Sequence, residues 1–570
     1  MHVRRITFLL LMSVSTLAAA QGPTDRTQLS QHIIQYEADL GSLRRFYTIA
    51  NSPERRQRFR ELNQQYLSQL DKLDFKALTP NNQVDFLLFQ RDLKEDLRLY
   101  TVADQESERI KGWFPFAESI YALEKKRRRG LALNAETLAQ DFNTWTAQAA
   151  EAEEKLGKMT SMDPVLASRA EETVKGLEQA IKSVFEFYNE YDPAFTWWMA
   201  KPYPKLIEQL QQLTRSIQPR AQLGEKAKDG SGIVGVAVGR EELMRQLKME
   251  YIPYTPEELL TIANQEFAWC DRELLKASRE MGFGNDWRAA QEKVKNSYVP
   301  AGKQPELILR LYQESVDFLK QHNLITIPPL AEETWRMGMM TPERQLINPF
   351  FLGGEQILIS YPTSGMEHAD KLMSMRGNNP HFSRSTVHHE LIAGHHLQMF
   401  MNNRYQTHRR RFSTPFWIEG WALYWEMVLW DKGFPQSPED KIGMLFWRMH
   451  RCARIIFSLN YHLGKWTPQQ CIDFLVDRVG HERANAEGEV RRSFVGGYEP
   501  LYQLAYMTGG LQFMALRREL VDSGKMTDKQ FHDSILQLNE LPVEFIRALL
   551  TQQPLRKDFQ TSWKFYSFAK

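Results

Sequence analysis

Apolar residues recur at helical spacing through most of the first 220 positions. The pattern is clear at Tyr66, Leu67, Leu70 and Leu73, and again between Val174 and Tyr188. Spacings of three and four residues place such side chains on one face of an α-helix. Helices are therefore predicted to dominate the N-terminal half.

A glycine-rich stretch at 224–239 interrupts this pattern and predicts a loop or linker. Beyond it, Thr255 followed by Pro256 has the composition of a helix start, with a capping hydroxyl and a proline in the first turn. A mature chain of about 550 residues is too long for one compact core. We therefore predict a mainly α, two-lobed fold. Its predicted parts are an N-terminal helical region at 21–223, a linker at 224–239 and a C-terminal helical region at 240–570.

One segment departs from the helical pattern in the C-terminal half. The run from Gln356 to Pro362 is rich in β-branched residues and is bounded by Gly354 and Pro362. This composition predicts a strand. We expect a small β element just upstream of the histidine cluster described below.

The first 20 residues have the three parts of a secretory signal. Arginines at positions 4 and 5 precede an apolar stretch from Ile6 to Leu17, and small residues follow up to Ala20. Residue 21 is Gln rather than Cys, so no lipid anchor is predicted, and no later apolar run approaches the ~20 residues that span a bilayer. The sequence predicts a signal peptide at 1–20 and a soluble exported protein, periplasmic or extracellular, without stable membrane insertion.

Composition narrows the class of protein. Lys and Arg total 72 against 70 Asp and Glu, and the formal charge of +2 gives no reason to expect a nucleic-acid partner. Only Cys270, Cys452 and Cys471 carry thiols, which excludes a disulfide-dense scaffold. One bridge between Cys452 and Cys471 is compatible with the sequence. Oligomeric state is left open.

The run H-H-E-L-I-A-G-H-H at 388–396 carries the strongest chemical signal. Zinc hydrolases commonly place H-E-x-x-H on a helix, where two His share a face and the Glu beside the first is the general base. Here Ala393 stands where the second His would be. The next candidates, His395 and His396, come six and seven residues after His389.

A straight helix would hold a metal poorly at this spacing. His396 would return to the face of His389 but lie about 10 Å further along the axis, and His395 would point away. A break at Ala393 and Gly394 would bring one of them back beside His389. We favour His395 as the second ligand and keep His396 as the alternative.

The segment resembles the bacterial family of unknown function numbered eight-eight-five, a gluzincin-like group with the signature H-E-x-x-P-G-H-H-L-Q. Positions 389–398 match it except that Ala393 replaces the proline. The resemblance implies a large helical metallopeptidase-like fold and a zinc site that uses the histidines of this segment.

A third ligand is expected downstream. Thr414 and Pro415 predict a helix start, and inside that helix Glu419 is followed by Gly420. A glycine costs about 1 kcal/mol in a helix interior, which is easier to understand if another backbone passes close by. The segment resembles the family's E-G-W-A motif and the N-E-G-F-A motif of gluzincin aminopeptidases, and the resemblance implies that Glu419 binds the metal. Glu426 is either a partner that fixes a His tautomer or a surface carboxylate.

Two further site residues follow from the same resemblance. The segments around Arg492 and Tyr506 look like the family's E-V-x-R-Y and P-G-Q-A-x-x-Y-x-x-G motifs, although Ser493 replaces a Tyr and Leu501-Tyr502 replaces Gly-Gln. The resemblance implies that Tyr506 donates to the oxyanion. It also implies that Arg492 binds a substrate carboxylate or braces the site. A core position is the alternative for Tyr506.

Together these patterns predict an exported zinc metallopeptidase that cleaves short peptides. One zinc per chain is expected on His389, His395 and Glu419, with Glu390 as general base. The N-terminal half is expected to form the opposing wall of the cleft. The alternatives are a metal-binding pseudoenzyme or peptide-binding protein, and a zinc amidase that acts on cell-wall fragments.

Overall fold

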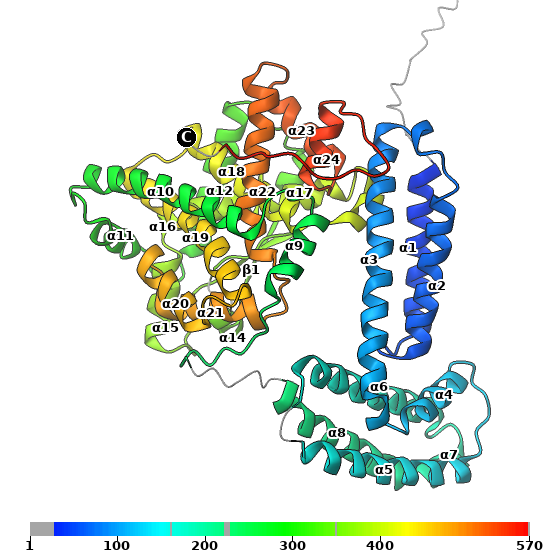
Figure 1. Ribbon diagram of the computed structural model, residues 1–570. Helices are drawn as coiled ribbons and strands as arrows, with labels where there is room; N and C mark the ends of the chain where they lie inside the picture. The colour runs from blue at the N-terminus through cyan, green and yellow to red at the C-terminus, as the bar shows by residue number, and fades with distance from the viewer. Residues whose placement is uncertain (1–27, 160–161, 222–228, 348–349, 568–570) are drawn as a thin grey trace, which may run out of the picture.

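The computed structural model describes residues 28–159, 162–221, 229–347 and 350–567. Within these residues the fold is mainly α with one small two-stranded sheet, as predicted (Figure 1). The predicted signal peptide lies outside the described residues, as does the 224–228 part of the predicted linker. The rest of that linker lies between the last helix of the N-terminal half and the first helix of the C-terminal half.

The N-terminal half consists of a helical bundle and a lobe at its lower end (Figure 1). The bundle is made of α1 (Gln28–Phe46), α2 (Pro53–Leu70) and α3 (Pro80–Ile110). The lobe is made of α4 (Ala117–Arg127), α5 (Ala135–Gly157), α6 (Pro164–Tyr188), α7 (Pro193–Met199) and α8 (Pro202–Ala221).

The C-terminal body holds the remaining helices and both strands. The helices up to the second strand are α9 (Gly239–Met249), α10 (Pro256–Glu280), α11 (Trp287–Lys295), α12 (Gln304–Gln321), α13 (Pro329–Thr334) and α14 (Pro342–Ile347), with strands β1 (Arg336–Met339) and β2 (Gln356–Ile359). The later helices are α15 (His368–Gly377), α16 (Pro380–Glu390), α17 (His395–Asn402), α18 (Pro415–Asp431), α19 (Pro438–His462), α20 (Pro468–Phe474), α21 (Arg483–Val495), α22 (Tyr502–Arg517), α23 (Asp528–Leu538) and α24 (Val543–Leu550). Short 3₁₀ or π turns are η1 (Phe75–Ala77), η2 (Lys111–Trp113), η3 (Thr407–Phe412), η4 (Leu475–Val479) and η5 (Arg518–Asp522).

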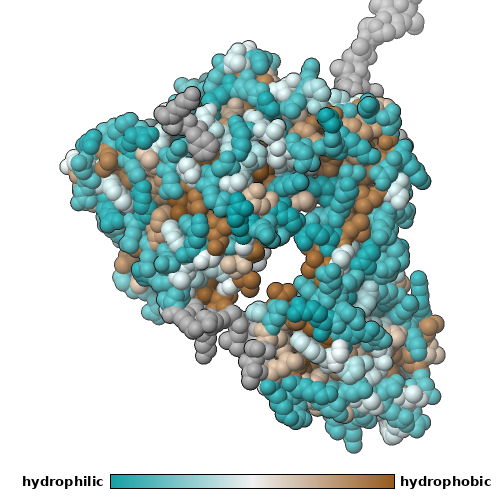
Figure 2. Space-filling model, viewed as in Figure 1, coloured by the Kyte–Doolittle hydropathy of each residue, from teal (hydrophilic) through white to brown (hydrophobic). Residues whose placement is uncertain are grey.

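The apolar core explains how these parts hold together. The lobe has a core of its own, which includes Phe142 and Ile181. The bundle does not, because Tyr36 and Phe89 belong to the same buried cluster as Trp421 of the C-terminal body. The bundle is therefore packed onto the body, and an opening separates the lobe from the body (Figure 2).

The predicted strand forms, in a shorter version. β2 pairs in parallel with β1, with Met337 opposite Ile357. On its other side, Leu358 forms an antiparallel bridge with Leu352. Both sides of β2 are thus in contact with protein backbone near Leu358.

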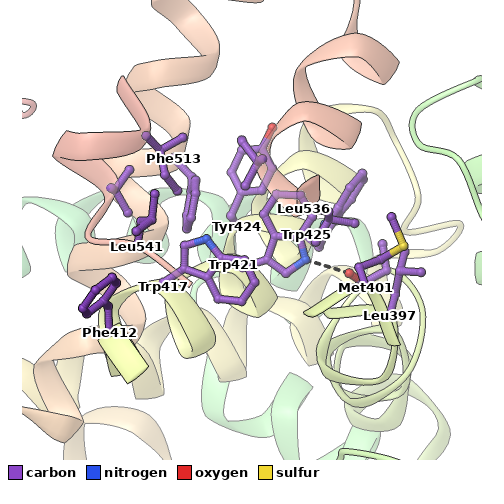
Figure 3. Packing of buried hydrophobic residues seen from close by; sticks show 14 of the residues in the cluster. Leu397, Met401, Phe412, Trp417, Trp421, Tyr424, Trp425, Phe513, Leu536 and Leu541 are labelled. Carbon is purple, nitrogen blue, oxygen red and sulfur yellow. Dashed lines mark hydrogen bonds between the residues drawn. The ribbon is translucent and has the colours of Figure 1, made fainter. Parts of the chain in front are cut away.

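The two helices in closest contact near the site are α18 and α22. At Gly420 of α18, an added Cβ would lie 2.6 Å from the Cα of Gly509 on α22. This close approach gives Gly420 the packing role that its place in a helix interior suggested. Beside it, the aromatic side chains of Trp417, Trp421 and Trp425 fill the core behind the site (Figure 3).

Substitution of Gly420 by Ala is expected to destabilise the protein by about 1–3 kcal/mol, since the helices must separate to admit the methyl group. Gly157 is the matched control, because it is helical and an added Cβ meets nothing within 4 Å. Its Ala variant should be neutral or slightly more stable. Urea unfolding of the two variants measures the difference, and equal unfolding midpoints would contradict this account of Gly420.

All three cysteines are free and buried. The bridge between Cys452 and Cys471 that the sequence allowed is therefore not formed. Among the described residues, no helix combines the length and apolar character needed to span a membrane.

Candidate metal centre

The histidine cluster lies on two helices separated by a sharp break. α16 begins at Pro380 and ends at Glu390, and the side chain of the preceding Asn379 caps the backbone N–H groups of the first turn. The chain turns through 391–394, with a cis peptide bond between Ile392 and Ala393, and α17 begins at His395. Gly394 packs directly against the carbonyl of His389, where any side chain would overlap. The predicted interruption of the helix at this glycine is confirmed.

This turn brings His395 back beside His389. Their ring centroids lie 4.9 Å apart with the planes nearly perpendicular. From α18, Glu419 Oε2 lies 3.6 Å from Nε2 of His389 and 3.3 Å from Nε2 of His395. The three side chains therefore converge on one point, although 30 positions of sequence separate the first from the last.

The far nitrogen of each imidazole is already engaged. His389 Nδ1 donates to Glu426 Oε1 at 2.7 Å, and His395 Nδ1 donates to Gln398 Oε1 at 3.0 Å. In the neutral imidazoles these contacts place the ring proton on Nδ1, so that each Nε2 presents a lone pair towards Glu419. Glu426 is thus the tautomer-fixing partner and not a surface carboxylate, and it is 5% exposed.

The other two histidines of the cluster do not reach this point. His396 has Nδ1 3.2 Å from the carbonyl of Gly354 and Nε2 2.9 Å from the carbonyl of Ala331. His388 is fully buried and packs edge-on against Phe434. The geometry therefore favours His395 over His396 as the second ligand.

Glu390 lies beside the same point. A ligand atom from each of His389, Glu390 and His395 falls within 4.8 Å of the others. The side chain of Glu390 packs on Gly353, where a Cβ would overlap its Oε2. The absence of a side chain at Gly353 therefore makes room for the carboxylate. Either Glu390 or Glu419 could therefore complete a set of three ligands with His389 and His395. The carboxylate oxygen of Glu419 lies closer to the two imidazoles than that of Glu390.

The pKa values of the acidic and basic side chains in the site depend on burial and on one another. Burial raises the pKa of Glu390. Burial would lower the pKa of His395, but the neighbouring Glu419 outweighs it and raises that pKa to about 9. Burial likewise opposes ionisation of Glu419, yet His395 and His389 hold its pKa well below the usual range. Glu419 is therefore a carboxylate at neutral pH, as a cation ligand must be.

The donor set fits zinc. Two ligand atoms that are each ~2.0–2.1 Å from a tetrahedral zinc lie roughly 3.3 Å apart, close to the observed separations of 3.6 and 3.3 Å. Glu419 Oε2 is buried and has no hydrogen-bond partner among the described residues. A buried anionic oxygen without a donor is costly, and a bound cation would satisfy it.

The site opens into a cavity of about 500 Å³. Its lining residues come from positions 344–540, and thus from the C-terminal body and not from the N-terminal half expected to form the opposing wall. Tyr506 lines it with its ring parallel to that of His389, 6.2 Å between centroids. One turn earlier on α22, the hydroxyl of Tyr502 donates to Glu419 Oε1. Glu419 is left with Oε2 alone to face the histidines.

Sequence reasoning missed several of these residues. Arg451 and Arg454 of α19 line the cavity next to the predicted Arg492. Both guanidinium groups lie over the ring of Tyr506, at 4.6 and 4.3 Å from its centroid. Arginines three residues apart inside a largely buried helix were the available signal. The contact from Tyr502 had no signal beyond its departure from the family motif.

Comparison with known families gives one match. Residues 48–550 match the family described as "Bacterial protein of unknown function (DUF885)". The chain belongs to this family. The match covers both halves of this DUF885 chain, including every residue of the candidate centre.

Two solved structures share the fold of this DUF885 chain. One is a protein from Shewanella oneidensis described as a "putative lipoprotein of unknown function", 17% identical, with a TM-score of 0.66 over 92% of this chain and 100% of that one. The other, from Colwellia psychrerythraea, is described as a "putative lipoprotein" and is 16% identical, with a TM-score of 0.60 over 92% and 98% of the two chains. None of the curated proteins compared is significantly similar. At this identity the likeness concerns the fold.

Proposed function

We propose that this chain is an exported zinc-dependent metallopeptidase that cleaves short peptides. The observation that carries the proposal is the convergence of His389 Nε2, His395 Nε2 and Glu419 Oε2 on one point.

The ligands would be His389, His395 and Glu419, one zinc per chain. Zinc bound there would polarise a substrate carbonyl and lower the pKa of water. Glu426 and Gln398 hold the two imidazoles in the orientation that ligation needs.

Glu390 would be the general base. It lines the cavity beside the metal-binding set, and burial raises its pKa, which suits a group that takes a proton from water and returns it to the leaving amine. Tyr506 would donate to the oxyanion that forms at the carbonyl, because it lines the same cavity and its hydroxyl stays protonated when burial raises its pKa.

The cavity supports short substrates over folded ones. Its volume of about 500 Å³ lies inside the range of small-molecule sites and admits only a few residues. Export would follow from the signal sequence at 1–20, and the protein would then meet peptides in the periplasm or outside the cell.

Removal of the metal tests the function. The protein should release products from a panel of short peptides, lose that activity after treatment with a chelator, and regain it with added zinc. Mass spectrometry of the products would measure this. Undiminished hydrolysis after metal removal would contradict the mechanism. Hydrolysis of murein fragments but of no peptide would favour a zinc amidase instead.

A further inference from the structure

A surplus of positive charge is buried on the Tyr506 side of the cavity. Arg451, Arg454 and Arg492 are 4%, 3% and 8% exposed, and each lines the cavity. The carboxylates within ion-pair distance of them are Glu426 and Glu489, and Glu419, whose charge also acts on Arg454, is assigned to the metal. Three guanidinium groups therefore share two carboxylates.

The pairing is uneven. Arg454 Nε donates to Glu489 Oε1 at 2.7 Å, and Arg451 contacts Glu426 at 3.3 Å. Arg492 comes no closer to Glu489 than 3.5 Å. Glu489 is further occupied, because Gln503 Nε2 also donates to Oε1. Arg492, which also lies 4.9 Å from the centroid of the Tyr498 ring, is thus the cation with the weakest carboxylate partner.

Donors at this end of the cavity are unsatisfied. Within the described chain, Nε of Arg492 and Nη1 of Arg454 are buried without a hydrogen-bond acceptor. The neighbouring His481 adds no further positive charge, since burial lowers its pKa to about 3 and keeps it neutral. A buried guanidinium that lacks acceptors is costly, and a carboxylate supplies two oxygens in the matching geometry.

The three arginines lie close enough to the metal-binding set to contact a carboxylate on the same substrate molecule. The ring of Tyr506 lies parallel to His389, and the guanidinium of Arg454 lies 4.3 Å from the centroid of that same ring. The imidazole of His389 and the guanidinium of Arg454 therefore both lie close to the same ring. One or two residues of extended peptide can cover such a span.

Building on the proposed function, we propose that Arg492, supported by Arg454, binds a carboxylate of the substrate and makes the enzyme selective for peptides with a negative charge close to the scissile bond. The resemblance left binding and bracing open for Arg492. The charge surplus and the unsatisfied donors favour binding. The carboxylate is either the free C-terminus of a short peptide or an acidic side chain next to the cleaved bond.

Matched substrates test this. One peptide would be prepared with a free C-terminus, as the C-terminal amide, and as the amide of an acidic residue at the same position. The free acid should be cleaved with a kcat/KM roughly 10- to 100-fold above the neutral amide. If the acidic amide is cleaved with the kcat/KM of the free acid, the site binds a side-chain carboxylate. If its kcat/KM stays at that of the neutral amide, the site binds the free C-terminus. Equal kcat/KM for all three would overturn the proposal while leaving a peptidase.

Variants separate binding from bracing. Arg492→Met should abolish the preference, so that the ratio of kcat/KM for the free acid to kcat/KM for the neutral amide falls to about one. Arg491→Met is the matched control, because Arg491 is the exposed neighbour on the same helix and should leave the preference unchanged. If Arg492→Met lowered both substrates equally, Arg492 would only brace the site and the proposal would fall.

A binding measurement keeps the two proposals distinguishable. Zinc-loaded protein that carries Glu390→Gln should bind the free acid more tightly than the amide in calorimetry, even if no peptide is hydrolysed by the parent. That result would support the carboxylate site and contradict the proposed peptidase activity. Equal affinity for acid and amide, or no binding of either, would overturn the carboxylate site.

Discussion

Replacement of Glu390 by Gln is expected to lower the kcat of peptide hydrolysis by roughly a hundredfold to ten-thousandfold, the usual contribution of a general base. The amide keeps the size of the side chain and its packing on Gly353 but cannot accept the proton. Product release followed under substrate saturation measures the loss. Zinc content should stay at the parent level, since Glu390 is not assigned as a ligand.

Glu355→Gln is the control for this prediction. Its side chain is 70% exposed and pairs with Arg336 on the surface, so hydrolysis should be unaffected. Full activity in the Glu390 variant would show that another group takes the proton. Zinc without turnover in the parent, on peptides and murein fragments alike, would favour a metal-binding pseudoenzyme or peptide-binding protein.

Substitution of Asp85 by Ala is expected to cost about 3–5 kcal/mol of stability, because it leaves a buried cation without its partner. Asp85 on α3 accepts from Arg409 Nε at 2.7 Å and lies 2.8 Å from His408 Nε2. Arg409 is completely buried. Asp558→Ala is the control, since that carboxylate is 71% exposed and its ion pair should contribute less than about 1 kcal/mol.

The Asp85 contribution should also depend on pH. Burial opposes ionisation of Asp85, but Arg409 and His408 prevail and hold its pKa below the usual 3.8. A carboxyl with a depressed folded pKa stabilises above its unfolded pKa and loses that contribution as pH falls through the folded value. The difference between parent and variant in urea unfolding should therefore be full at neutral pH and shrink below about pH 4. An equal difference at all pH values would contradict the ion pair.

The position of this ion pair links stability to the site. Asp85 reaches from the N-terminal bundle to η3, the turn that connects α17 to α18. Those two helices carry His395 and Glu419. The N-terminal half thus braces the connection between two proposed ligands, although none of its described residues lines the cavity.

Local sequence signals predicted much of this arrangement. The helix start at Thr414 and Pro415 is confirmed, with Thr414 accepting from the backbone N–H of Phe416. The roles of Gly394 and Gly420 could be predicted because a close backbone approach at each position leaves no room for a side chain. The helix start depends on residues adjacent in the chain. The two glycines follow the general rule that a glycine is unfavourable in a helix interior and so indicates a break or a close backbone contact.

Other features depend on tertiary contacts that no local pattern encodes. The choice of His395 over His396 follows from carbonyls of Ala331 and Gly354, which reach His396 from distant segments. The arginines of α19 meet Tyr506 only because α19 and α22 pack together. The core shared by the N-terminal bundle and the C-terminal body likewise arises from contacts between segments hundreds of residues apart.

Metal content per chain is the measurement that tests the central claim most directly. Elemental analysis should find about one zinc in the parent and in His322→Ala, a control at an exposed histidine, and far less in His395→Ala and Glu419→Ala. Each variant should unfold cooperatively, so that loss of metal is not loss of fold. No zinc in the parent after zinc is supplied, or equal zinc in all four proteins, would contradict the site and with it the proposed chemistry.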